Sequence, residues 1–141
     1  MEREFAREAR LENLEALRDF VVDSCHECQA DPATCDALEL AVDEVCANLV
    51  MHGYAGLEPG PIRLTFNCDD RMAEVTIVDF GHAFSPDAIP KPDLEAHWSD
   101  RRVGGLGWHI IRKAVDEIVY QADGAAGNRL TLRKRLHPNG G

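Results

Sequence analysis

The sequence predicts a two-layer α/β sandwich of the α+β type, in which helices cover one face of a mixed, mostly antiparallel β-sheet. Apolar residues recur every three or four positions in residues 11–28 and 31–53, which is the period of helices with one buried face. Apolar and polar residues alternate in 62–66 and 73–77, which is the pattern of an antiparallel hairpin with one buried face. Helices and strands that each bury one face are expected to pack into a single core.

The first half of the chain is expected to place two helices next to each other. Residues 3–9 alternate only weakly, and fit either a short edge strand or the frayed start of a helix. The first helix then covers residues 11–28. Pro32 fits the first turn of the second helix, where a missing N–H costs little, and Asp31 or Thr34 can cap that helix.

The second half is expected to supply the hairpin, a long loop, a third helix and two closing strands. The hairpin ends at the segment Asp79-Phe-Gly81. Residues 83–103 contain three prolines and no regular period, so we expect a functional loop that acts as a lid. A helix then covers residues 108–115, and residues 117–121 and 129–136 have the pattern of a strand pair.

Length and charge limit the possible functions. A chain of 141 residues is a natural size for one domain, which we assign to residues 5–136, with a loose tail over 137–141. The formal net charge of -10 argues against a nucleic-acid partner, because duplex binding depends on neutralising phosphates. No apolar run has the length of a signal peptide or a membrane span, so we expect a cytoplasmic protein without membrane contact.

The cysteines leave a minor alternative open. The chain has five, namely Cys25, Cys28, Cys35, Cys46 and Cys68. An odd number without an export signal argues against a disulfide framework. Cys25 and Cys28 have the spacing of half a zinc knuckle, yet no second pair has comparable spacing. A cysteine-based sensor stays a hypothesis, and free thiols on or under a helix are the simpler alternative.

The helix predicted over residues 31–53 carries the strongest functional signal. Glu44, Asn48 and His52 are four residues apart, so they lie close to one line along the edge of the apolar stripe. Core packing holds side chains at such an edge while they can still reach a ligand. An ordinary amphipathic helix with solvated polar residues would look the same on this stretch alone.

Two later segments add to this signal. Gly104, Gly105 and Gly107 precede or open a helix, where free N–H groups and the absence of a Cβ suit an anionic ligand such as phosphate. Arg101 or Arg102 beside them can supply positive charge. The segment is not a Walker loop, because no Gly-Lys-Ser/Thr follows. Taken singly, a plain glycine-rich loop and a turn-capping Asp79 remain the simpler interpretations.

The order of these motifs resembles the nucleotide site of the GHKL superfamily of ATPases, which includes gyrases and histidine kinases. The chain is most similar to the anti-sigma-factor serine protein kinases, through Glu44-Val-Cys-Ala-Asn48-Leu-Val-Met-His52-Gly-Tyr54 and Arg102-Val-Gly-Gly-Leu-Gly107. The resemblance covers about residues 5–136, and implies a Bergerat-type ATP-binding fold with ATP and Mg²⁺ as ligands.

The resemblance implies a role for each motif residue. Asn48 would hold Mg²⁺ through its side-chain oxygen, and Glu44 would be the general base. Asp79 would accept the amino hydrogen of adenine, and Gly81 would let the base approach the backbone.

The glycine motif would bind the phosphates of ATP. Gly105, Leu106 and Gly107, with Gly104 beside them, would supply N–H groups, and Arg102 would contact the phosphate tail. His52 matches the family in position, although a histidine near a helix C-terminus is more often a dipole contact.

The chain departs from the family pattern at three places. Ala83 stands where a second glycine is common, although Asp79 to Phe84 fits the form Asp-x-Gly-x-x-Phe seen in anti-sigma-type members. Trp108 follows the glycines where Leu or Phe is usual, and Asn128 follows Gly127 where many relatives carry threonine. None of these removes a catalytic group.

The resemblance therefore implies a serine/threonine protein kinase that acts as an anti-sigma factor. It would phosphorylate a serine of an antagonist protein and sequester a sigma factor, and it could form a homodimer. The alternative is a nucleotide-gated binding module with little or no phosphoryl transfer, because binding and transfer share almost every residue.

Overall fold

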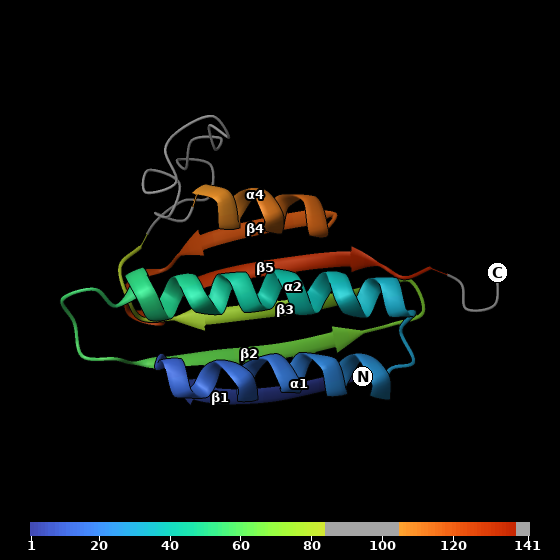
Figure 1. Cartoon of the computed structure of the whole chain (residues 1–141), viewed down its shortest axis with the longest axis horizontal. Helices are drawn as coiled ribbons and strands as arrows, with labels where there is room; N and C mark the ends of the chain where they lie inside the picture. The colour runs from blue at the N-terminus through green and yellow to red at the C-terminus, as the bar shows by residue number, and fades with distance from the viewer. Residues whose placement is uncertain (84–104, 138–141) are drawn as a thin grey trace.

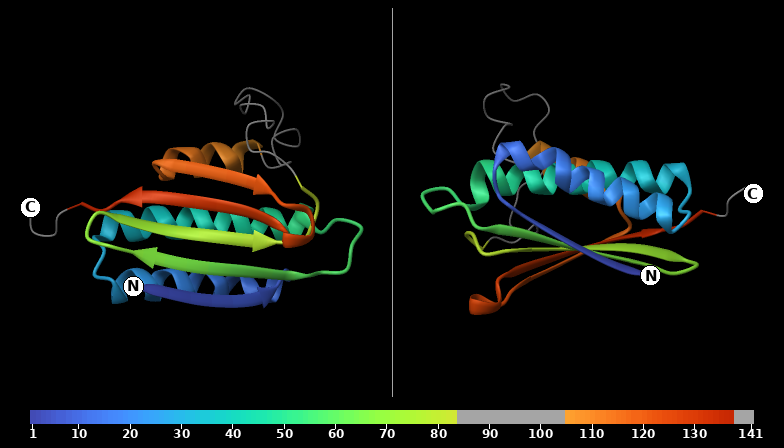
Figure 2. Two further views of the ribbon diagram at one scale, coloured as in Figure 1. Left: turned by 180° about the vertical axis from the view of Figure 1, so that it is seen from behind. Right: turned by 90° about the horizontal axis from the view of Figure 1, so that it is seen from below.

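A five-stranded antiparallel sheet lies under a single layer of helices (Figure 2). The computed structural model describes residues 1–83 and 105–137. The strands are β1 (Glu2–Glu8), β2 (Pro61–Cys68), β3 (Met72–Asp79), β4 (Glu117–Ala122) and β5 (Asn128–Arg135). Their order in the sheet is β1-β2-β3-β5-β4, and each neighbouring pair is antiparallel. The predicted fold class is confirmed, with a sheet that is antiparallel throughout the described ranges rather than mixed.

In the described part of the chain, three α-helices cover one face of this sheet (Figure 1). They are α1 (Leu14–Glu27), α2 (Pro32–Asn48) and α4 (Gly105–Ala114), and α2 packs between the other two. Alternate residues of the central strands point into the layer between helices and sheet, among them Leu64, Ile77 and Leu132, which are almost fully buried. The apolar side chains of the helices and of the strands thus form one core, as expected from the sequence.

The two N-terminal helices begin and end close to the predicted positions. A 3₁₀ turn (η1, Leu11–Asn13) precedes α1. Of the two candidate caps for α2, Asp31 is the one used, because its carboxylate accepts a hydrogen bond from the backbone N–H of Thr34 at 3.0 Å. Pro32 occupies the first turn, where no donor is lost.

The last turn of the second helical segment is a π-turn (η2, Leu49–Gly53). Gly53 ends the helical run as predicted, but without the positive φ of a left-handed cap. A Cβ here would lie 2.9 Å from the end of the Leu49 side chain, so that side chain would have to shift. π-turns are rare and frequently lie at functional sites.

The first strand settles the weak signal of residues 3–9 in favour of an edge strand. β1 pairs with β2, and its inward positions are held by Arg3, Phe5 and Arg7. The guanidinium carbon of Arg7 lies 4.2 Å from the ring centroid of Phe5, and that of Arg3 lies 5.3 Å from the ring of Phe20. Charged residues therefore cover the apolar layer here, which hides the alternation.

The remaining elements follow the predicted order. α4 is followed by β4, a 3₁₀ turn (η4, Gly124–Ala126) and β5. The predicted lid lies outside the described residues except for Ala83, and so does the predicted tail except for His137. Among the described residues, no helix is both long enough and apolar enough to span a membrane.

Candidate functional site

The C-terminal end of α2 places Glu44 and Asn48 at the edge of the core. Val45 and Leu49 are buried, while Glu44 and Asn48, one turn apart, are half-buried. Burial raises the pKa of the Glu44 carboxyl, and the neighbouring negative charge of Asp43 raises it further. Glu44 is therefore a stronger base than an exposed glutamate.

The side-chain nitrogen of Asn48 is buried and has no hydrogen-bond partner among the described residues. A buried amide without a partner is costly, and such a group in a native structure indicates a ligand or water partner. Because half a turn of the amide exchanges its nitrogen and oxygen, either atom can face that partner.

The first turn of α4 closes against these two side chains. A Cβ on Gly107 would lie 3.0 Å from Oε2 of Glu44 and 3.5 Å from Nδ2 of Asn48. Glycine thus lets the backbone of α4 approach both groups. Trp108 and Ile111, farther along α4, are buried and hold the helix to the core. Three predicted site residues, Glu44, Asn48 and Gly107, are thereby brought together.

Asp79 ends β3 with its side chain turned into the layer below the helices. It is only 5% exposed. Its Oδ1 accepts hydrogen bonds from the Gly81 N–H at 2.9 Å and from Nδ2 of Asn128 at 3.0 Å, whereas Oδ2 accepts none from the described residues. Burial raises the pKa of Asp79, and these two hydrogen bonds oppose the rise. One oxygen is thus fixed by the protein and the other is left to accept from a ligand.

Gly81 joins this end of the sheet to the end of the helical run. A Cβ on Gly81 would collide with the carbonyl group of Gly53, and the next N–H, that of His82, donates to Gly53 O at 2.7 Å. Asp79 and Asn48 therefore lie next to opposite ends of the same π-turn. Asn48 directly precedes the turn in the sequence, and Asp79 is joined to its last residue, Gly53, through the contact of Gly81.

The Tyr54 hydroxyl holds the same junction from a second side. It donates to the carbonyl oxygen of Pro61 at 2.8 Å and accepts from the N–H of Phe80 at 2.8 Å. This links the residue after the π-turn to the start of β2 and to the residue between Asp79 and Gly81. Burial raises the pKa of Tyr54, so the hydroxyl keeps the proton that it donates.

The other predicted residues are placed less closely. The π-turn takes His52 off the line of Glu44 and Asn48, because its repeat is longer than four residues, and the ring is exposed. Gly105 and Leu106 are the first two residues of α4. Arg102 and Gly104 lie outside the described residues.

The side chains present fit a divalent cation only as a partial ligand set. No group of three or more His, Cys, Asp or Glu side chains in residues 1–83 and 105–137 could hold a metal ion. The unpartnered Asn48 amide beside the Glu44 carboxylate does fit Mg²⁺, which takes one or two protein oxygens and completes its shell with water and phosphate.

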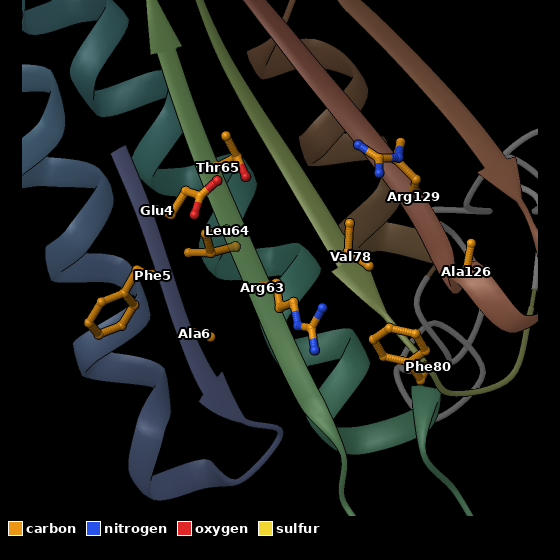
Figure 3. A pocket seen from close by; sticks show the side chains of 10 residues that line it. All are labelled: Glu4, Phe5, Ala6, Arg63, Leu64, Thr65, Val78, Phe80, Ala126 and Arg129. Atoms are coloured by element: carbon orange, nitrogen blue, oxygen red, sulfur yellow. The ribbon is translucent and has the colours of Figure 1, made fainter. Parts of the chain in front are cut away.

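A separate hollow of about 490 Å³ lies on the face of the sheet that carries no helices (Figure 3). Arg63 and Arg129 line it, and the guanidinium carbon of Arg63 lies 5.4 Å from the ring centroid of Phe80. None of the predicted site residues lines this hollow, so it is distinct from the site at α2 and Asp79.

Comparison with known proteins accounts for this arrangement. A family model of the histidine kinase-like ATPase domain matches residues 7–134. The chain belongs to the histidine kinase-like ATPase family. The serine-protein kinase RsbW of Bacillus velezensis is 29% identical over 104 residues, covering 71% of this ATPase domain and 64% of the relative. An anti-sigma F factor of Halalkalibacterium halodurans is 28% identical over 117 residues, covering 77% of this chain and 75% of the relative.

A solved structure shows the same fold. The crystal structure of the RsbU and RsbW domains of a Mycobacterium tuberculosis protein matches this ATPase domain with a TM-score of 0.69 and 20% identity. The match covers 98% of this chain and 33% of that protein. The chain thus spans 64% of the first of these relatives and a third of the solved chain.

Sequence reasoning assigned no role to two residues that hold the candidate site together. Tyr54 ends the motif that begins at Glu44, and only the fold shows that its hydroxyl joins the end of the helical run to the start of β2 and to the residue after β3. Asn128 stood out as a departure from the family pattern, and the register that sets it opposite Asp79 reveals what it does.

Proposed function

We propose that this ATPase domain binds ATP with Mg²⁺ at the junction of α2, α4 and the end of β3. The observation that carries the proposal is the buried, unpartnered Asn48 amide between Glu44 and the backbone of Gly107. At the other end of the π-turn, the free Oδ2 of Asp79 suits the amino group of adenine. Gly81, Arg102, Gly104, Gly105, Leu106 and His52 are assigned to the same nucleotide site from the family motif.

Asn48 and Glu44 have different roles in this proposal. Asn48 holds Mg²⁺, which offsets the negative charge of the phosphates when it is bound. Glu44 accepts a proton from the hydroxyl group that attacks the terminal phosphate, and its raised pKa suits this task. The first turn of α4 directs N–H groups toward the phosphates.

We further propose serine/threonine kinase activity toward an antagonist protein, combined with sequestration of a sigma factor. The support is the family membership together with relatives named serine-protein kinase and anti-sigma F factor. Retention of Glu44 favours phosphoryl transfer over binding alone.

Calorimetric titration with a non-hydrolysable ATP analogue, with and without Mg²⁺, tests the site. We expect Mg²⁺-dependent binding that Asn48→Ala abolishes. Asn67→Ala is the matched control, because Asn67 is a half-buried asparagine on the helix-free face of β2. Unchanged nucleotide affinity in the Asn48 variant would refute the assignment.

A second experiment separates the kinase from the nucleotide-gated binding module. Glu44→Gln keeps the size of the side chain and removes the base, so we expect analogue binding to persist and transfer from labelled ATP to a candidate antagonist to stop. Glu15→Gln, at an exposed position of α1, is the control. Binding without transfer in the wild-type protein, with a cognate partner present, would establish the binding module instead.

A further inference from the structure

The helix-free face of the sheet carries two unpaired positive charges, although the chain has a net charge of -10. Arg63 on β2 and Arg129 on β5 lie in one cross-strand row, on either side of Val78 on β3. Both arginines are exposed, and neither forms an ion pair with a residue in 1–83 or 105–137. Their guanidinium groups can therefore bind an anion from outside.

The same face shows how an arginine behaves there when acidic residues are in reach. Farther along β5, Nε of Arg133 lies 2.6 Å from Glu74, and its Nη1 lies 2.9 Å from Glu117. Glu74 and Glu117 are the direct cross-strand neighbours of Arg133. The direct cross-strand neighbours of Arg63 and Arg129 are uncharged, namely Ala6, Val78 and Gln121.

The two arginines border the hollow of about 490 Å³ on this face (Figure 3). Val78 and the ring of Phe80 give the hollow apolar walls, and Thr65 adds a hydroxyl group. The Phe80 side chain is 38% exposed, which leaves part of an aromatic ring open to a ligand. The hollow thus offers positive charge on both sides of an apolar floor.

The wall formed by Phe80 is held in place before any ligand arrives. The Phe80 N–H donates to the Tyr54 hydroxyl at 2.8 Å, and the guanidinium carbon of Arg63 lies 5.4 Å from the ring centroid (Figure 3). Gly127, with a φ of 90°, leaves room for the ring, because a Cβ there would lie 2.9 Å from a ring carbon. Groups that are already positioned lose less freedom when a ligand binds.

An acidic peptide fits this hollow better than a nucleic acid or a small anion does. A guanidinium group binds a carboxylate through two parallel hydrogen bonds. A nucleic acid would bring many phosphates close to a chain of net charge -10. A small inorganic anion would leave Val78 and Phe80 uncovered, whereas the side chains of a peptide can cover them.

We propose that this hollow docks an extended acidic segment of a partner protein, in which two carboxylates flank an apolar side chain. The carboxylates pair with Arg63 and Arg129, and the apolar side chain covers Val78 between them. Side chains on one face of an extended peptide are about 6.6 Å apart, and neighbouring strands of a sheet are about 4.8 Å apart. A segment that crosses the strands therefore meets the row with every second residue, and the long arginine side chains take up the difference. The contact is small, so docking is weak and reversible.

A nuclear magnetic resonance titration of the isotope-labelled whole chain tests the proposal. The probe is the synthetic peptide Ser-Glu-Ser-Leu-Ser-Glu-Ser. We expect saturable shifts of the backbone amides of Arg63, Val78, Phe80 and Arg129, and weaker binding as salt is added, because exposed ion pairs are screened. The same peptide with glutamine in place of glutamate should not bind. No saturable shift at these amides, or equal binding of the glutamine peptide, would overturn the proposal.

The same spectra identify other occupants of the hollow. Shifts at these amides that grow with protein concentration alone would mean that a second copy of the chain covers the hollow. The same shifts produced by acetate at the concentration of the peptide would mean a simple anion site. Either result would overturn the proposal.

Variants show whether position or net charge attracts the peptide. Arg63→Ala and Arg129→Ala should each lower peptide affinity about two- to fivefold. Arg71→Ala is the matched control, because it removes the same charge from an exposed position next to the β2–β3 turn, and should have no effect. Glu4→Gln removes a carboxylate that lines the hollow, so it should strengthen binding. A loss in the Arg71 variant as large as in the Arg63 variant, or weaker binding in the Glu4 variant, would contradict the proposal.

This docking surface is tested separately from the nucleotide site. None of the residues assigned to the nucleotide site lines the hollow, and the titration uses no nucleotide. Failure of the peptide to bind therefore leaves the proposed ATP site untouched, and a protein that binds no ATP analogue can still bind the peptide.

Discussion

Replacing Asn128 with alanine should weaken both the fold and the proposed nucleotide site, because this one side chain holds Asp79 in place. Its Nδ2 donates to Oδ1 of Asp79 at 3.0 Å and to the carbonyl oxygen of Gly81 at 3.0 Å. Hydrogen bonds to a charged acceptor contribute about 1.5–3 kcal/mol, and those to a neutral one about 0.5–1.5 kcal/mol. Both acceptors are shielded, so we expect Asn128→Ala to lower the free energy of unfolding by roughly 2–4 kcal/mol at neutral pH.

This loss should shrink in acid, for a reason that concerns Asp79 alone. Burial raises the pKa of Asp79 in the folded state, so its contribution to stability is largest at low pH and falls as pH rises through the folded pKa. Asn128 opposes that rise in pKa, so removing it raises the folded pKa further. The variant therefore loses more stability above the folded pKa than below it, where the protonated carboxyl no longer needs the donor.

Urea unfolding at neutral and acid pH, followed by circular dichroism, measures both effects. A double-mutant cycle with Asp79→Ala isolates the pair, because alanine has no acceptor, and we expect a coupling energy of about 1.5–3 kcal/mol at neutral pH. Asn67→Ala controls for the loss of an amide elsewhere on the sheet. A coupling energy near zero, or a stability loss that is the same at both pH values, would refute the role given to Asn128.

Three further changes test the parts that surround the site. Tyr54→Phe removes both hydrogen bonds of the hydroxyl, and should lower the free energy of unfolding by about 1–3 kcal/mol in urea titration without changing the denaturant slope; no loss would contradict the bracing role. Gly81→Ala drives a Cβ into Gly53, so nucleotide-analogue affinity should fall, whereas Gly56→Asn, in an open turn with positive φ, should keep it. Asp31→Asn weakens three hydrogen bonds to the Asp31 carboxylate. Burial tends to raise the pKa of Asp31, but these bonds hold it below its usual value, so the variant's loss of stability at neutral pH should vanish as pH falls through the folded pKa of Asp31. A difference in stability that persists in strong acid would contradict this.

Local periodicity predicted most of the fold because each central element obeys a simple rule. α2 keeps apolar residues on one face, and apolar and polar residues alternate along most of β2 and β3, so both patterns can be recognised in the sequence. Glu44 and Asn48 could be identified for the same reason, since their spacing is a property of the helix itself. The sequence also placed Asp79 correctly at the end of its strand.

Features that depend on distant partners escaped prediction. The sequence pattern of β1 did not indicate a buried face, because two of its inward positions are arginines. Only the structure shows that these arginines pack on Phe5 and Phe20. Nothing in the sequence near Asn128 indicates its role, because that role depends on Asn128 lying opposite Asp79 on the neighbouring strand. The π-turn at Leu49–Gly53 differs from an α-helical turn by one residue per repeat, which is below the resolution of a periodicity argument.

The strand order has a consequence for how the protein is made. β3 pairs with β2 as soon as the hairpin is complete, but its other edge waits for β5, which begins at Asn128. Ribosomes add roughly 5–20 residues per second, so the nascent chain carries that open edge for about 3–10 s while roughly 50 further residues are joined. An open strand edge is a template for pairing with other chains, and during this interval the hairpin depends on chaperones or on its own covering helices for protection. Asp79 acquires its hydrogen bond from Asn128 only after β5 has been made, so a chain that stops before Asn128 lacks this support for Asp79.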